Sequence, residues 1–285
     1  RSEPYFEEKA LDAEDWSVFV DEVSGKALET GKVMAARAEE LDYARRYDVW
    51  TLAPVSECWA MTRKPPIGSR WIDIDKGDAS KPCYRSRLVI QEVRMSGTEA
   101  IFAATPPLES IRFLLSLQRS RRGCKVMFID VRRAHWTAKI DRLVYVRLPP
   151  EALPSDCSEP MCGRLNKAMY GCRDAARQWE IEITDFFVCN GFVPGLGSPA
   201  LYVNTVRDIK VSVHGDDVTA LGRAEDLEWL KDRFLERYEI KYGGMLGDGP
   251  KDVQDVMILN RLVHYGSFET TIETDPRHVK FYSMN

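Results

Sequence analysis

Alternating apolar and polar residues mark several short strands along the chain. Residues 69–74 and 84–90 alternate, and residues 125–131 form an apolar run that carries one acid, Asp130, near its end. Residues 211–218 place apolar positions on both sides of Gly-Asp-Asp, which predicts two strands joined by a tight turn. The pattern therefore predicts a sheet with a hairpin that carries two adjacent acids at its tip.

Helix formers and helical periodicity predict helices between these strands. Residues 105–118 carry an apolar stripe, with Thr105 as a candidate N-cap and Pro106 in the first turn. The other predicted helices lie within residues 35–46, 164–191 and 224–238. Glycines between positions 243 and 249 predict a loop, and residues 253–274 predict a hairpin that turns near Gly266.

The composition is that of a globular protein: 285 residues, 44% hydrophobic and 29% charged. No apolar stretch approaches the ~18 residues of a membrane span, and the first residues do not form a signal peptide. We expect an intracellular protein, cytoplasmic and also nuclear, that makes no contact with a membrane. The seven Cys lack Cys-x-x-Cys spacing, which favours free thiols over a zinc site.

The net charge of −4 does not by itself point to nucleic-acid binding. However, residues 111–125 hold four Arg and one Lys without any acid. A basic track can lie on an acidic protein. The alternative is a solvated helix end, where basic side chains also favour the helix dipole.

Acids at strand ends are the strongest candidates for chemistry. Asp216 and Asp217 repel each other at the predicted hairpin tip, so a basic side chain or a divalent metal should lie opposite them. Asp130 at the end of a buried strand is costly unless it is paired or metal-bound. Two such carboxylate sites suit a pair of Mg²⁺ ions in phosphoryl transfer. The alternative is that Asp216 and Asp217 are ordinary turn residues.

Basic residues and a turn supply candidate phosphate contacts. Arg85 and Arg87 point to the same face of a predicted strand, because side chains two apart in a strand share a face. Such a face can hold phosphates, although a solvated strand face is the commoner case. Tyr170 and Gly171 lie in a turn into a helix, where backbone amides can meet a phosphate.

Five motifs stand in a characteristic order. They are Tyr-Arg-Ser-Arg-Leu-Val at 84–89, Ala-Thr-Pro-Pro-Leu-Glu-Ser-Ile-Arg at 104–112, Ile-Asp-Val-Arg-Arg-Ala at 129–134, Leu-Asn-Lys-Ala-Met-Tyr-Gly at 165–171 with Arg177 and Trp179, and Gly-Asp-Asp at 215–217. In this order they resemble the reverse transcriptase region of copia-type LTR-retrotransposon polyproteins. The resemblance runs from about residue 50 to about residue 280.

The resemblance implies an α+β right-hand polymerase fold, with an antiparallel palm sheet packed on helices and the thumb largely absent. A helical lead-in would cover residues 1–49, and residues 50–285 would form the polymerase domain. Fingers would come from about 50–105 and 140–168, the palm from about 106–139 and 169–245, and a primer-grip-like hairpin from 253–274.

The resemblance also implies an RNA-directed DNA polymerase, a nucleotidyltransferase that adds dNTPs to a primer on an RNA or DNA template. Two Mg²⁺ ions, replaceable by Mn²⁺, would be held by Asp130, Asp216, Asp217 and the backbone carbonyl of Val131. Arg87 would contact the triphosphate, and Gly171 would lie beside the incoming nucleotide. The remainder of the Pol polyprotein, including ribonuclease H and integrase, would be a partner.

Four positions depart from the family pattern. His214 and Gly215 stand where an aromatic residue and an apolar residue usually precede the acid pair. His135 stands where an aromatic residue usually excludes the ribose 2′-hydroxyl, and its alternative is an ordinary surface histidine. Asp174 adds an acid near a phosphate site, so we expect it to weaken nucleotide affinity.

Two other functions fit parts of the pattern. The departures at His135 and Gly215 suit a catalytically decayed remnant that acts at most as a nucleic-acid-binding module. A metal-dependent phosphodiesterase would use the same carboxylates but usually adds His or Glu ligands, and none of the four His lies near both Asp clusters in the sequence.

Overall fold

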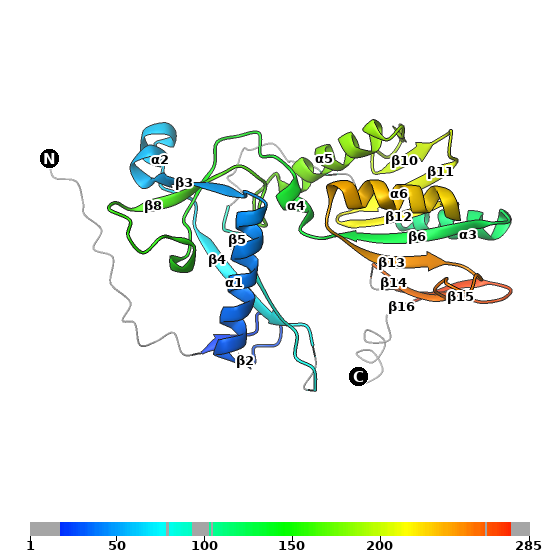
Figure 1. The fold of residues 1–285 in the computed structure, drawn as a ribbon, viewed down its shortest axis with the longest axis horizontal. Coiled ribbons are helices and arrows are strands. Elements are labelled where there is room, and N and C mark those ends of the chain that lie inside the picture. Colours follow the sequence, from blue (N-terminus) through cyan, green and yellow to red (C-terminus); the bar gives the residue numbers. More distant parts are fainter. Residues whose placement is uncertain (1–17, 78–79, 93–102, 104, 260, 275–285) are drawn as a thin grey trace. The chain divides into compact units, whose positions relative to one another are not determined.

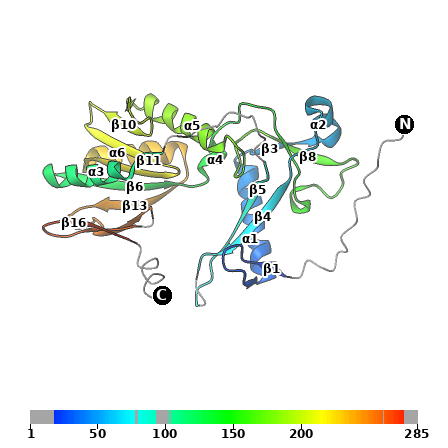
Figure 2. The same ribbon diagram turned by 180° about the vertical axis from the view of Figure 1, so that it is seen from behind.

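The computed structural model describes residues 18–77, 80–92, 103, 105–259 and 261–274; the first 17 residues of the predicted lead-in lie outside them. The chain divides into two compact units, drawn in Figures 1 and 2. Unit 1 comprises Arg1–Thr98 and Ile140–Ala175, and unit 2 comprises Glu99–Lys139 and Ala176–Asn285. Both units mix helices with antiparallel strands, which confirms the mixed class of the predicted fold.

Unit 1 is built from short strand pairs and two α-helices. Its elements are β1 (Phe19–Val20), β2 (Ala27–Leu28), α1 (Thr30–Arg46), β3 (Trp50–Pro54), α2 (Val55–Thr62), β4 (Ser69–Asp75), β5 (Tyr84–Ile90), β7 (Tyr145–Val146), the 3-10 helix η1 (Pro150–Ala152) and β8 (Met161–Leu165). β4 pairs with β5, and β8 lies between β3 and β7. The alternation at 69–74 and 84–90 therefore predicted β4 and β5 correctly.

A buried ion pair ties α1 to β4. The Arg37 guanidinium lies 2.6 Å from an Asp73 carboxylate oxygen, and both residues are almost fully buried. The Ser86 hydroxyl donates to the same carboxylate at 2.6 Å. Arg37 also pairs with Glu151 at 3.4 Å. Because removing the Arg37 charge would leave the Asp73 carboxylate buried without its ion-pair partner, this pair fixes α1 to unit 1.

Unit 2 is organised around a six-stranded antiparallel sheet. Its elements are α3 (Leu108–Ser120), β6 (Cys124–Val131), α4 (Ala134–Thr137), α5 (Ala175–Cys189), β9 (Val193–Pro194), β10 (Leu201–Asn204), β11 (Ile209–His214), β12 (Asp217–Arg223), α6 (Ala224–Arg237), β13 (Ile240–Leu246), β14 (Asp255–Ile258), β15 (Arg261–Tyr265) and β16 (Thr270–Thr274). The strand order is β13-β6-β12-β11-β10-β9, and β14, β15 and β16 form a separate antiparallel sheet.

The two faces of the large sheet bury different side chains because neighbouring strand residues point to opposite faces. Met127, Ile129 and Val131 pack with the apolar faces of α5 and α6, including Phe186 and Phe234. Val126 and Phe128 of β6 face the other way and pack with α3 and the small sheet. Asp130 shares the parity of Val126 and Phe128, so it leaves the sheet on the face covered by α3 and β14–β16.

The structure differs from three sequence predictions. Helix α3 begins at Leu108 without a side-chain cap, because residues that precede a proline disfavour helical geometry and Pro106 precedes Pro107. The glycines at 243 and 244 lie in β13 at a bulge opposite Phe128, not in a loop. Residues 255–274 form three strands instead of a two-stranded hairpin, because Arg261–Tyr265 pairs with both neighbours.

No helix among the described residues has the length and apolar character needed to cross a membrane. All seven Cys are free thiols, as predicted.

Candidate active site

The acid pair lies at a two-residue hairpin between β11 and β12, as predicted. His214 pairs with Asp217 across the strands, so Gly215 and Asp216 form the turn. Gly215 has a φ of +63°, whereas Asp216 is not among the residues with positive φ. A positive φ at the first central position alone is the pattern of a type II′ turn, which favours glycine there.

Pairing across four strands aligns charged side chains on one face of the sheet. Asp217 pairs with His214 on β11 and with Asp130 on β6, and Asp130 pairs with Lys241 on β13. Side chains of directly opposed residues lie on the same face. The structure therefore places His214, Asp217, Asp130 and Lys241 in one row, and it brings together two of the three predicted carboxylates by strand register.

Two hydrogen bonds hold the turn that carries the third carboxylate. The Val131 amide donates to the Asp216 carbonyl at 2.9 Å, which ties the turn to the end of β6. The Trp179 indole N–H donates to the Gly215 carbonyl at 2.7 Å from α5. In the sequence, Trp179 was noted only as part of an apolar stripe and of a motif. Its hydrogen bond to the turn could not be predicted without the fold.

The charge row changes the protonation of Asp217. Burial, and next the negative charges of Asp216 and Asp130, raise its pKa from 3.8 to about 6, while the Lys241 ammonium opposes the rise. Three carboxyl groups thus interact electrostatically at this end of the sheet. A divalent cation would relieve both their repulsion and the cost of burying Asp217.

The donor set fits Mg²⁺, which prefers hard oxygen ligands. A cavity of about 130 Å³ is lined by Asp130, Asp217 and Lys241 and also by residues of β14. Asp216 is exposed on the turn, and in the described part of the chain the three carboxylates are not all within 4.8 Å of one another.

The described residues that do converge this closely are Glu92, Cys172 and Asp174 of unit 1. They make a poor metal site, because Arg142 already donates to all four of the carboxylate oxygens at 2.7–2.9 Å. Burial also raises the pKa of the Cys172 thiol to about 11, which disfavours the thiolate that a metal requires. A cation would have to displace Arg142.

The same network pairs Asp174. This carboxylate is buried and bound to Arg142, which also pairs with Glu92. The expected weakening of nucleotide affinity stays a prediction. Burial alone would raise the pKa of Asp174, but the hydrogen bond from Arg142 lowers it overall. The partners are 32 residues apart, and no local pattern indicated the pairing.

The predicted phosphate-contact residues of unit 1 lie on β5 and on the turn beside it. Arg85 and Arg87 share the face of β5 opposite the buried Ser86 and Leu88, and the Arg87 guanidinium lies 4.8 Å from the Tyr170 ring centroid. The Arg87 Nε atom is buried without a hydrogen-bond partner among the described residues. An anion bound beside Arg87 would supply a hydrogen-bond acceptor for this Nε atom.

Gly171 has a structural reason to be glycine. Its φ is +87°, and a Cβ atom there would lie 2.0 Å from the Ile90 carbonyl oxygen. The Ile90 amide also donates to the Tyr170 carbonyl at 2.8 Å, so the turn is fixed on the end of β5. A contact with a nucleotide is therefore not needed to explain this glycine.

Both candidate histidines of unit 2 border the acidic turn. His135 lies on α4 and lines a cavity of about 110 Å³ together with Trp179 and Gly215. The Nδ1 atom of His214 is buried and lacks a hydrogen-bond partner in the described part of the chain. His214 lies next to the turn by its place in the sequence, whereas the proximity of His135 to Gly215 was not predicted.

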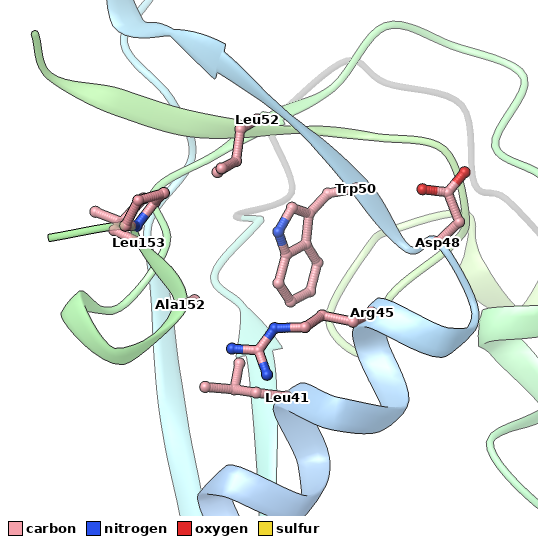
Figure 3. A pocket seen from close by; sticks show the side chains of 8 residues that line it. Leu41, Arg45, Asp48, Trp50, Leu52, Ala152 and Leu153 are labelled. Atoms are coloured by element: carbon pink, nitrogen blue, oxygen red, sulfur yellow. The ribbon is translucent and has the colours of Figure 1, made fainter. Parts of the chain in front are cut away.

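A cavity of about 450 Å³ in unit 1 is separate from these residues (Figure 3). Figure 3 shows the Trp50 indole beside the Arg45 guanidinium, above Leu41. No residue of the predicted site lines this cavity, so it supports no part of the catalytic hypothesis.

Comparisons with known proteins agree with the motif order. The family described as "Reverse transcriptase (RNA-dependent DNA polymerase)" matches residues 47–248. The Arabidopsis thaliana "Retrovirus-related Pol polyprotein from transposon RE2" is 28% identical over 221 residues, covering 70% of this chain and 15% of that protein. The corresponding polyprotein from transposon TNT 1-94 of Nicotiana tabacum is 24% identical over 207 residues, with the same two coverages.

The Pol polyprotein from transposon RE1 of Arabidopsis thaliana is 26% identical over 196 residues, covering 64% of this chain and 13% of that protein. The chain thus spans only about a seventh of the length of these relatives. The matches confirm the resemblance to the reverse transcriptase of copia-type retrotransposon polyproteins. Because the family match covers most of the chain and includes Asp130, Asp216 and Asp217, the chain belongs to the reverse transcriptase (RNA-dependent DNA polymerase) family.

Proposed function

We propose that the chain is a template-directed DNA polymerase that extends a primer 3′-hydroxyl with dNTPs on an RNA or DNA template. In this proposal unit 1 supplies the fingers, and unit 2 supplies the palm and the sheet β14–β16 that supports the primer. The observation that carries the proposal is the register that pairs Asp217 with Asp130, beside a turn that presents Asp216.

The residues that would hold two Mg²⁺ ions are Asp130, Asp216, Asp217 and the Val131 carbonyl. When bound, such a metal pair activates the attacking hydroxyl and stabilises the charge of an in-line displacement at the α-phosphate. Asp130 and Asp217 supply oxygen ligands from neighbouring strands, and Asp216 supplies them from the turn. The bonds from Val131 and Trp179 hold that turn in place.

Arg87, His135 and Gly171 complete the proposed nucleotide site. Arg87 would donate to the triphosphate, and the Tyr170 ring beneath it would keep the guanidinium oriented. His135 would lie beside the sugar, where an imidazole excludes a ribose 2′-hydroxyl less completely than a larger aromatic ring. We expect weaker discrimination against ribonucleotides than an aromatic residue would give.

A primer-extension assay tests the proposal. Asp130→Asn and Asp216→Asn should each reduce extension by at least about 100-fold, since each removes a carboxylate that would hold a metal ion. Asp232→Asn, which neutralises an exposed acid on α6, is the matched control and should extend normally. Extension that survives in Asp130→Asn or Asp216→Asn contradicts the assignment, and primer-template binding without incorporation by the unmodified chain favours a decayed remnant.

The relatives are Pol polyproteins, and we propose that this chain likewise functions within a longer polyprotein. Ribonuclease H and integrase regions would be its partners there. An intracellular location, in the cytoplasm and the nucleus, follows from that proposal.

A further inference from the structure

The basic segment at 111–125 is largely paired within unit 2. The Arg119 guanidinium lies 3.7 Å from the Tyr265 ring centroid and donates to Thr270, which fixes α3 to the turn between β15 and β16. Lys125 forms an ion pair with Asp252 at 2.6 Å. Arg122, in contrast, is exposed and has neither an ion pair nor a hydrogen bond in the described part of the chain.

Arg122 lines a pocket of about 620 Å³ where three chain segments of unit 2 meet. The segments are the α3–β6 connection, the β10–β11 turn and the junction of β12 with α6. Each segment contributes arginine to the pocket. Its charged lining residues are Arg121, Arg122, Arg207, Arg223, Asp208 and Asp226.

Two of the positive charges in the pocket have no partner among the residues that the structure describes. Arg121 pairs with Asp208 at 2.7 Å, and Arg207 pairs with Asp226 at 2.9 Å. Arg223 is exposed and, like Arg122, has no partner among the described residues. Within the described part of the chain, the pocket therefore has two unpaired guanidinium groups, although the net charge of the protein is −4.

The fold adds positive potential at the same place. Helix α6 begins directly after Arg223, which occupies its N-cap position without a side-chain cap. The uncapped amides of a helix start carry partial positive charge, which attracts anions. The dipole of α6 adds to the positive potential of the arginine pocket, although the negative charge of Asp226 in the first turn offsets part of this potential.

The pocket is separate from the acidic turn. Arg223 pairs with Cys124 at one end of the β6–β12 ladder, and Asp217 pairs with Asp130 at the other end. Six residues of strand separate the two ends, which corresponds to about 20 Å. The arginines therefore cannot bind a triphosphate held at the carboxylates.

We propose that this pocket binds phosphate groups through Arg122 and Arg223. Guanidinium forks match phosphate oxygens in pairs, and a paired Arg207 held 4.0 Å from the Trp229 ring centroid gives the pocket a rigid wall. Phosphate groups could come from the backbone of a nucleic-acid duplex or from a free polyphosphate. The inference that the phosphates belong to a nucleic-acid duplex rests on the proposed polymerase function. The inference that the pocket binds phosphate does not rest on it.

The test measures binding by the full chain in EDTA, so that polymerisation does not contribute. The probes are a fluorescent 16-base-pair DNA duplex and, separately, sodium tripolyphosphate. Arg122→Gln/Arg223→Gln should weaken duplex binding by about tenfold in 0.1 M salt and reduce the slope of log K against log salt by about 1 to 2. Arg45→Gln/Arg147→Gln removes the same charge from exposed sites of unit 1 and is the control.

Each outcome decides the proposal. Loss of duplex binding in the pocket variant but not in the control supports the site and the nucleic-acid source. Loss of tripolyphosphate binding with unchanged duplex binding supports the site and assigns it to free polyphosphate. Unchanged binding of both probes overturns it. Arg122→Lys/Arg223→Lys should retain part of the affinity for the probes. The binding test does not depend on polymerase activity, because a chain that fails to extend primers can still lose or keep binding.

Discussion

Asp217→Asn should stabilise the metal-free protein while it impairs the proposed catalysis. The pKa of Asp217 is raised from 3.8 to about 6 in the folded state, first by burial and then by Asp216 and Asp130. An acid with a raised folded-state pKa favours folding at low pH, and this contribution disappears as the pH rises through the folded-state pKa. The destabilisation by Asp217 therefore begins above about pH 3.8, where the unfolded chain ionises, and is complete above about pH 6.

The magnitude follows from the shift. A change from 3.8 to about 6 corresponds to about 3 kcal/mol at pH 8. Because Asp217 is only half-buried, solvent screening reduces this to about 1 to 3 kcal/mol. At pH 4.5 the folded state still binds the proton, so the gain from Asp217→Asn should fall to about one-third of its value at pH 8.

Urea denaturation of the metal-free chain at pH 8 and pH 4.5 measures both gains. Asp232→Asn on α6 removes an exposed acid from the same unit and should change the free energy of unfolding by less than about 0.5 kcal/mol at either pH. A loss of stability in Asp217→Asn at pH 8, or equal gains at the two pH values, would refute the reasoning.

Three further substitutions test how the site is held. Gly171→Ala should destabilise unit 1 by more than about 2 kcal/mol in urea denaturation, because its Cβ would lie 2.0 Å from the Ile90 carbonyl oxygen at a φ of +87°. Gly215→Ala, in contrast, meets no atom within 4 Å and should cost only about 1 kcal/mol. Trp179→Phe removes the donor to the Gly215 carbonyl and should slow primer extension by about tenfold, with about 1 to 3 kcal/mol lost in stability; unchanged extension would show that the turn does not need this bond.

The sequence predicted elements whose signal is local. Alternation placed β4 and β5 correctly, and the apolar run at 125–131 became β6 with Asp130 near its end. The Gly-Asp-Asp hairpin was also predicted, because a turn type and its flanking strands are specified by a few adjacent residues.

The features that the sequence did not predict depend on contacts between residues far apart in the chain. Gly243 and Gly244 suggested a loop, but pairing with β6 made them part of β13, and a bulge absorbed the irregularity. Lys241 lies in the row with Asp130 and Asp217 only because β13 pairs with β6, so no sequence pattern predicted its position. Arg142 pairs with Asp174 from 32 residues away, so no local pattern predicted this pairing.

The most direct test of the central claim is whether the template dictates incorporation. The full chain, supplied with Mg²⁺ and a primed RNA template, should add only the complementary dNTP when each of the four is offered alone. Changing the template base should change the nucleotide that is added, and Asp130→Asn should abolish addition. Incorporation that ignores the template base, or that persists in Asp130→Asn, would contradict the account.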